Sequence, residues 1–134
     1  MNVVLAPGVL EATLKHARES LPNEGCGLIV GKGCVADRLI PMENVLASAT
    51  SFEMEPAVMV SLFRAMRESG EDLVAIYHSH PSGPEYPSSQ DIQKARYPNA
   101  AQLIVSFEQP ESPVVRGFRI IDGEALEIEL HAIV

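Results

Sequence analysis

The amino-acid sequence predicts an α/β fold, an α+β sandwich in which a mixed central sheet is flanked by two main helices and one short helix. Three observations lead to this prediction. The chain has 134 residues, of which 46% are hydrophobic and 21% charged, so we expect a single globular domain over residues 1–134. Two segments place apolar residues at helical spacing. Several short apolar segments lie between Gly, Pro and Asn turn signals, which is typical of strands.

The first forty residues predict a strand, a helix and a hairpin. Val3 to Leu5 favours a short strand, and a helix follows Pro7 and ends at Pro22-Asn23. The apolar stripe expected on this helix consists of Leu10, Leu14, Ala17 and Leu21. The hairpin consists of strands over 27–31 and 35–40, joined at Gly31-Lys32-Gly33.

The next segment predicts a loop over 44–51, a short strand over 52–54 and the second main helix. Pro56 opens this helix and Gly70 closes it, since proline suits a first helical turn and glycine a helix end. The apolar residues expected on one face of it are Met59, Leu62, Phe63 and Met66.

The segment 73–79 is the most strand-like of the chain, and apolar residues on both of its faces predict a central, buried strand. It runs into Pro81-Ser82-Gly83-Pro84, which cannot continue a sheet. A short helix is expected over 88–96. Three further strands are expected over 102–107, 114–121 and 125–133.

Charge and hydropathy exclude several classes of function. The net charge is −8, and the 10 Lys and Arg residues form no basic patch, so we expect no nucleic-acid partner. No apolar run approaches the ~20 residues of a membrane span, so no membrane association is expected. The amino terminus lacks the basic start of a secretory signal. Cys26 and Cys34 therefore predict free thiols in a reducing, cytoplasmic location.

The segment that carries chemistry is His78-Ser79-His80-Pro81, followed by Ser88 and Asp91. Two histidines at i and i+2 of a strand point the same way and can bind one metal ion. Asp91, at the start of the next helix, is the natural third ligand of a catalytic zinc site with one zinc per chain. Each part also has a structural interpretation: the histidines as polar strand ends, and Ser88-x-x-Asp91 as a helix capping box.

These residues resemble the motif of the JAMM (MPN+) metalloproteases. That motif has H-x-H, seven residues, S, two residues and D, and the spacing from His78 to Asp91 matches it. Upstream, residues 24–31 (EGCGLIVG) resemble the glutamate-bearing segment of the same family. The resemblance covers most of the chain from Leu5 to Phe107. The short length is most similar to the stand-alone bacterial and archaeal members.

The resemblance implies a cytidine-deaminase-like architecture and a role for each matching residue. His78, His80 and Asp91 would bind zinc, Glu24 would be the general acid/base, and Ser88 would stabilise the oxyanion. The implied substrate is the carboxyl-terminal tail of a ubiquitin-like sulfur-carrier protein ending in Gly-Gly, cut as a peptide or isopeptide bond.

Several alternatives stay open. Glu85 in the Pro-rich loop is the rival general base, and Cys26 near the metal is by default a small packing residue. The chain could instead be a non-catalytic MPN-type scaffold, although such relatives lack the ligands. It could also be a zinc hydrolase of another substrate class, although it lacks the CxxC of zinc deaminases. Whether the protein forms a homodimer is left open.

Overall fold

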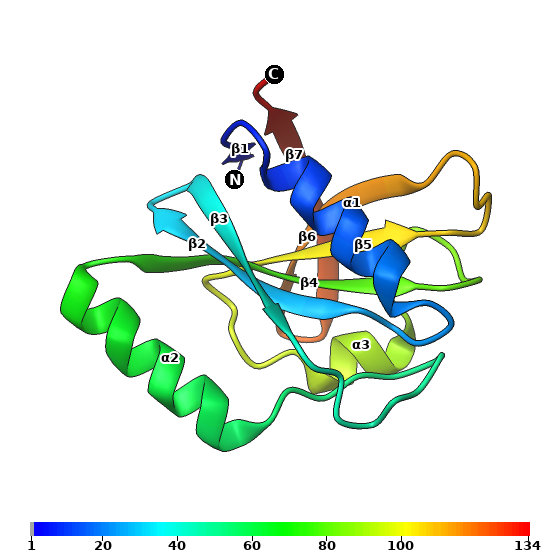
Figure 1. Cartoon of the computed structure of the whole chain (residues 1–134), viewed down its shortest axis with the longest axis horizontal. Helices are drawn as coiled ribbons and strands as arrows, with labels where there is room; N and C mark the ends of the chain where they lie inside the picture. Colours follow the sequence, from blue (N-terminus) through cyan, green and yellow to red (C-terminus); the bar gives the residue numbers. More distant parts are fainter. Residues whose placement is uncertain (1) are drawn as a thin grey trace.

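The computed structural model describes residues 2–134 and contains a mixed sheet whose strand order is β1-β3-β2-β4-β5-β6-β7 (Figure 1). β1 pairs in parallel with both β3 and β7, so the sheet closes into a barrel. The strands are β1 (Asn2–Leu5), β2 (Cys26–Lys32), β3 (Val35–Met42), β4 (Asp72–His80), β5 (Ala101–Ser106), β6 (Val114–Ile121) and β7 (Glu124–Ala132). The helices are α1 (Val9–Ser20), α2 (Pro56–Ser69) and α3 (Ser89–Lys94). The predicted α/β class is confirmed. The closure of the sheet into a barrel is a feature that the sequence did not predict.

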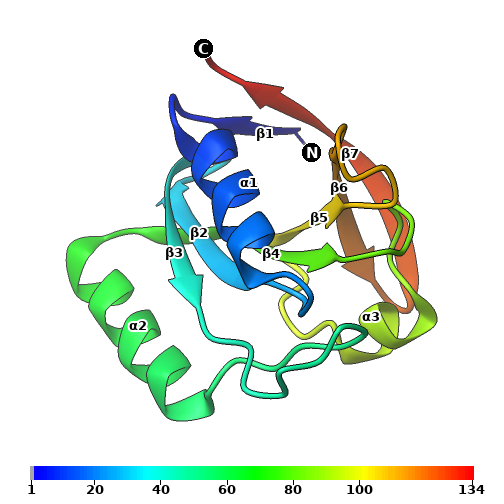
Figure 2. The same cartoon turned by 45° about the vertical axis from the view of Figure 1, so that its right-hand side comes forward.

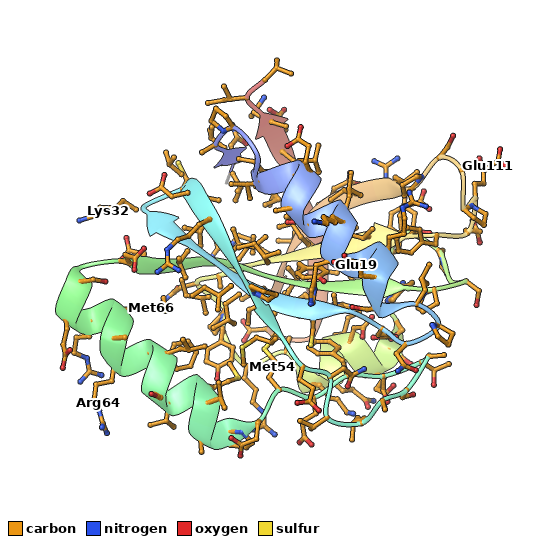
Figure 3. All side chains as sticks on the ribbon, viewed as in Figure 1. Glu19, Lys32, Met54, Arg64, Met66 and Glu111 are labelled. Carbon is orange, nitrogen blue, oxygen red and sulfur yellow. The ribbon has the colours of Figure 1, made fainter. Side chains whose placement is uncertain are left out.

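Two apolar cores lie on opposite faces of β2 and β4. Ile29 and Tyr77 belong to the core under α1, whereas Leu28 and Ile76 belong to the core under α2. Successive strand residues point to opposite faces, so this alternation places the two main helices on opposite sides of the sheet (Figure 2). Met66 of α2 lies at the helix–sheet contact, whereas Arg64 points outward from the helix (Figure 3).

The predicted helix boundaries follow from local chemistry. Pro56 is the first residue of α2, and the Glu55 side chain caps the helix by accepting a hydrogen bond from the Val58 amide at 2.9 Å. Gly70 ends α2 with a φ of 74°, a left-handed conformation that favours glycine. In α1 the buried stripe is Val9, Thr13 and Ala17, while the expected stripe member Leu21 lies beyond the helix end and is exposed.

β4 is the central strand that its sequence predicts. It pairs antiparallel with β2 and parallel with β5, and every residue from Val74 to His80 is buried. A parallel pair needs a crossover connection, and here that connection contains α3. The crossover returns α3 to the carboxyl end of β4, where the two histidines lie.

The strand predicted over 52–54 is wrong. Residues 43–55 form no strand, because β4 already has β2 and β5 as neighbours and the closed sheet leaves no edge for another strand. The apolar side chains of this segment are used differently. Phe52 stacks on His78, and Met54 is buried in the core under α2.

Among the helices within residues 2–134, none has the length and apolar character needed to span a bilayer.

Candidate active site

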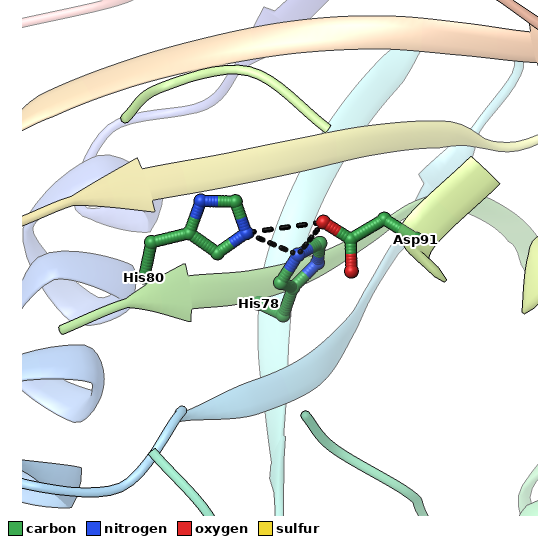
Figure 4. A group of neighbouring side chains, drawn as sticks. All are labelled: His78, His80 and Asp91. Atoms are coloured by element: carbon green, nitrogen blue, oxygen red, sulfur yellow. Dashed lines mark hydrogen bonds and ion pairs between the residues drawn. The ribbon is translucent and has the colours of Figure 1, made fainter. Parts of the chain in front are cut away.

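The three predicted metal ligands lie together at the end of β4 (Figure 4). The Nε2 atoms of His78 and His80 are 3.1 Å apart. The Oδ2 atom of Asp91 lies 3.2 Å from the first and 3.1 Å from the second. Both imidazoles are buried, and the Asp91 side chain is only 11% exposed. Three ligating atoms therefore converge on one point.

The elements around the centre explain this convergence. His78 and His80 share one face of β4, while Asp91 lies in the first turn of α3. The loop between the two elements is held against β5, where the Ser106 hydroxyl donates a hydrogen bond to the Gly83 carbonyl at 2.6 Å. This contact helps to turn the chain back, so that the start of α3 faces the end of β4.

Different contacts orient the two histidine rings. His80 Nδ1 lies 2.6 Å from the Pro84 carbonyl, which can only accept, so Nδ1 carries the proton and Nε2 presents its lone pair. His78 Nδ1 is buried and has no hydrogen-bond partner within residues 2–134. Its ring is instead stacked on Phe52, with the ring centroids 4.7 Å apart.

The donor set fits a small tetrahedral metal ion. Ligands at ~2.0–2.1 Å from zinc lie roughly 3.3–3.5 Å from one another, close to the spacing of these three atoms. Two imidazole nitrogens and one carboxylate oxygen also match the three protein ligands of catalytic zinc sites. Without a cation, the imidazoles can bond to Asp91 only by carrying protons on Nε2, and a metal ion would take the place of those protons.

The charges at the centre are strongly coupled. Burial opposes ionisation of Asp91, but the hydrogen bonds from His78 and His80 outweigh it and hold the pKa of this carboxyl far below its usual range. Burial lowers the pKa of His78. For His80, burial acts in the same direction, but Asp91 and the Pro84 carbonyl outweigh it and raise the pKa. The Asp91 carboxyl is therefore anionic and the His78 ring neutral, whereas His80 would have to release a proton to bind a metal.

Glu24 is a buried carboxyl beside this centre. Its side chain is 3% exposed, and its Oε1 atom has no hydrogen-bond partner among the described residues. Cys26 lies opposite His78 in the β2–β4 pairing, so continuing the register places Glu24 beside His80. Burial raises the pKa of Glu24 to about 7, although His80 partly offsets this effect. Such a carboxyl can accept and release a proton near neutral pH.

Ser88 is exposed and forms the capping box that its spacing predicts. Its hydroxyl accepts a hydrogen bond from the Asp91 amide at 3.1 Å, and its own amide donates to Asp91 Oδ2 at 2.9 Å. The hydroxyl still has its own hydrogen available as a donor. Because the box holds Asp91 Oδ2, it also orients the third predicted metal ligand.

Comparisons with known proteins agree with this geometry. Residues 6–120 match the family described as prokaryotic homologues of the JAB domain. This chain belongs to that family. A "CysO-cysteine peptidase" of Mycobacterium tuberculosis is 34% identical over 93% of this chain and 87% of its own. A "probable TtuB-protein conjugate cleaving protease" of Thermus thermophilus is 42% identical over 67% of this chain and 61% of its own. A solution structure of a Desulfitobacterium hafniense protein has a TM-score of 0.87 and 34% identity, and the match covers 99% of this chain and 93% of that one.

The prediction of a JAMM-type metallopeptidase is thus confirmed at the level of family and enzyme class. In this peptidase the rival base Glu85 forms an ion pair, with its carboxylate 3.7 Å from the Arg116 guanidinium on β6. Cys26 is fully buried in the core under α2. Burial raises the pKa of its thiol to about 12, and the side chain packs among apolar neighbours, as expected of a small packing residue.

Three residues around the centre were missed from the sequence. Phe52 stacks on a ligand histidine, Asn44 bonds the Glu24 carbonyl, and Ser79 bonds the Gly25 amide. Ser79 carries a local signal, because a hydroxyl between two ligand histidines lies on the opposite face of the strand from them. Asn44 and Phe52 lie in a loop and carry no such signal.

Proposed function

We propose that this protein is a zinc-dependent peptidase that hydrolyses an amide bond at the carboxyl-terminal tail of a ubiquitin-like sulfur-carrier protein. The observation that carries the proposal is the convergence of His78, His80 and Asp91 on one point beside the buried carboxyl of Glu24. A non-catalytic scaffold would have no use for a buried acid next to three ligands, because an unpartnered buried carboxyl is unfavourable for folding.

In this proposal His78, His80 and Asp91 hold one zinc ion per chain. Zinc, when bound, lowers the pKa of a water molecule towards ~7 and polarises the scissile carbonyl. The protein supplies the orientation of the site. The Pro84 carbonyl orients the His80 ring, and the Phe52 ring orients the His78 ring. The capping box of α3 orients the Asp91 carboxylate.

Glu24 is the proposed general acid/base. Because its pKa is near 7, a large fraction of the side chain is ionised at neutral pH and can take a proton from the attacking water. The protonated form is then close enough in free energy to deliver that proton to the leaving amine. Glu85 is not assigned this role, because its partner is Arg116.

Ser88 is the proposed donor to the oxyanion of the tetrahedral intermediate. Its hydroxyl is anchored at the start of α3 and retains a free hydrogen. A fixed donor at that position stabilises charge that appears only as the carbonyl is attacked.

The proposed substrate class rests on the relatives. One is named as a peptidase of CysO-cysteine, and another as a protease that cleaves TtuB-protein conjugates. We infer that this chain cleaves an amide bond at the tail of a small carrier, after a Gly-Gly terminus, whose lack of side chains suits a tail that passes a buried metal centre. We place the reaction in the cytoplasm, with residues 1–134 as one catalytic domain.

Three purified substrates test this proposal. One is a carrier of the ubiquitin-like fold ending in Gly-Gly-cysteine, the second carries the same tail joined to a lysine ε-amine, and the third ends in Gly-Gly. Mass spectrometry should show cleavage after the second glycine in the cysteine-tailed carrier, in the lysine-linked carrier or in both. The carrier that ends in Gly-Gly should stay unchanged. A chelator should stop the reaction and zinc should restore it. A zinc-loaded protein that binds the carriers and cleaves none would overturn the proposal in favour of a scaffold.

A further inference from the structure

The peptide group between Glu24 and Gly25 is held at both of its polar atoms by side chains. Its carbonyl, on Glu24, accepts a hydrogen bond from Asn44 Nδ2 at 3.0 Å. Its N–H, on Gly25, donates to Ser79 Oγ at 2.7 Å. Peptide groups next to a sheet usually bond to other backbone groups. Here two side chains from distant segments set the orientation of one peptide plane.

Ser79 provides the link to the metal ligands. It is fully buried between His78 and His80, and its amide donates to the Gly25 carbonyl at 3.0 Å. In a regular antiparallel pair, the Gly25 amide would donate to the Ser79 carbonyl in return. It donates to the hydroxyl instead, so the last pair of the β2–β4 ladder is completed by a side chain. The peptide that follows Glu24 is thereby fixed to the strand that carries both histidines.

Asn44 provides the link to the loop over 43–55. Besides Glu24, its Nδ2 donates to the carbonyls of Ser51 at 3.0 Å and Ser48 at 3.4 Å. Its Oδ1 accepts from the amides of Leu46 and Glu53, both at 3.2 Å. The side chain therefore makes five hydrogen bonds. The Ser48 carbonyl of the same loop also accepts a hydrogen bond from the Glu24 amide at 2.8 Å.

The backbone position matters because the carboxyl group itself is weakly held. Glu24 Oε1 is buried without a hydrogen-bond partner among the described residues, so backbone geometry and packing direct the side chain. Gly25 also has no space for a side chain. A Cβ atom there would lie 2.8 Å from the Tyr77 hydroxyl and 2.9 Å from Ser20 Oγ.

We propose that Asn44 and Ser79 are positioning residues that direct the Glu24 carboxylate at the metal centre by fixing the Glu24–Gly25 peptide. This inference rests on the proposed role of Glu24 as the general acid/base. Proton transfer depends steeply on distance and angle, and a misplacement of about 1 Å can reduce a rate on the order of 10²-fold.

The test compares Ser79→Ala, Asn44→Asp and the double variant with a matched control, Thr13→Ala. Asn44→Asp keeps the oxygen that accepts from Leu46 and Glu53 but loses the donor to Glu24. Thr13→Ala removes another buried hydroxyl. That hydroxyl donates a hydrogen bond to the Val9 carbonyl within α1 and is not bonded to the Glu24–Gly25 peptide. The measurements are zinc content, Tm, hydrogen exchange of the Gly25 amide by NMR, and kcat and KM on the Gly-Gly-cysteine carrier. Each kcat is taken at the top of that variant's pH profile, so that the charge of the new Asp is separated from its geometry.

Both single variants should keep stoichiometric zinc and a near-normal KM, while kcat falls by about 10- to 100-fold. The double variant should lose little more than the worse single one, because both changes release the same peptide. The Gly25 amide should exchange faster in Asn44→Asp, although Asn44 does not touch that amide. Thr13→Ala should lower Tm and leave kcat unchanged.

Wild-type kcat in both single variants would overturn the inference. Unchanged exchange of the Gly25 amide in Asn44→Asp would also overturn it. So would a double variant whose loss of kcat is the product of the two single losses. Failure of the proposed function would look different. In that case wild-type protein cleaves no carrier, while the exchange measurement still reports whether Asn44 and Ser79 fix the peptide.

Discussion

Phe52 and His78 are stacked, with ring centroids 4.7 Å apart and ring planes inclined by 21°. In the part of the chain that the structure describes, the buried Nδ1 atom of His78 has no hydrogen-bond partner, so stacking orients this ring, whereas a carbonyl orients His80. Ligand histidines usually rely on a hydrogen bond from the second ring nitrogen. The loop over 43–55 thus takes part in building the metal centre.

Replacing Phe52 with alanine should weaken zinc binding. Loss of a group that orients a metal ligand typically reduces affinity by about 10- to 100-fold, and we expect an effect of that size. Competition with a chromophoric chelator measures it. Phe63→Ala is the control, because Phe63 packs against Tyr97 and the α2 core. Equal zinc affinity in the Phe52 variant and wild type would show that the Phe52 ring is not needed to orient His78.

Zinc content should depend on the three ligands together. Purified protein should contain about one zinc per chain, and His80→Ala should lose most of it, because two remaining ligands bind zinc weakly. Elemental analysis of His80→Ala and of the His78→Ala/His80→Ala pair tests this. The metal-free protein should stay folded by circular dichroism, since two apolar cores hold it. Stoichiometric zinc in the double variant would place the metal elsewhere.

Glu24→Gln separates chemistry from metal binding. The amide keeps the size of the side chain but cannot accept the proton, so kcat should fall by about 10²–10⁴-fold with KM little changed. Steady-state kinetics on the Gly-Gly-cysteine carrier measures both constants, and zinc content should be normal. Glu85→Gln, which removes only the partner of Arg116, should be nearly neutral. The reverse result would move the general base into the Pro-rich loop.

The same substitution should also change the pH dependence of stability in the metal-free protein. Burial raises the pKa of Glu24 to about 7, so folding favours the protonated form over the ionised form. The stability that this group contributes is present below its unfolded pKa of ~4.3 and is lost as pH rises through about 7. Glu24→Gln should therefore raise Tm relative to wild type by roughly 2–8 °C at pH 8 and much less at pH 5. A Tm difference that does not grow with pH would mean that Glu24 is not held in a desolvated site.

Ser88 combines a cap with a proposed catalytic donor, and two variants distinguish the functions. Ser88→Ala should lower kcat by about 10²–10³-fold and the free energy of unfolding by ~1 kcal/mol. Ser88→Gly should show the same loss of kcat with a smaller loss of stability, since glycine replaces a serine cap at a cost of only a few tenths of a kcal/mol. Kinetics and thermal unfolding of both variants give the comparison. Wild-type turnover in either one would leave Ser88 as a helix cap only.

The parts of this protein that sequence determines are those with a local cause. The helices follow from apolar spacing together with Pro56 and Gly70, and β4 follows from its apolar residues on both faces. The proximity of His78 and His80 follows from the two-residue period of a strand, and the capping box of α3 from the spacing of Ser88 and Asp91. Such patterns need only the geometry of one element.

Tertiary structure decided what depends on contacts between distant segments. The apolar segment at Phe52 resembles a strand, but the closed sheet leaves it no partner, and it packs on His78 instead. Glu24 is one of 18 acidic residues, and only the approach of β4 and the loop over 43–55 buries it and raises its pKa. Asn44 reaches the Glu24 carbonyl across 20 positions, and Ser79 reaches the Gly25 amide across 54. Contacts over such separations form only when the whole chain has folded, so a local pattern can place Ser79 on one face of its strand but cannot identify its partner.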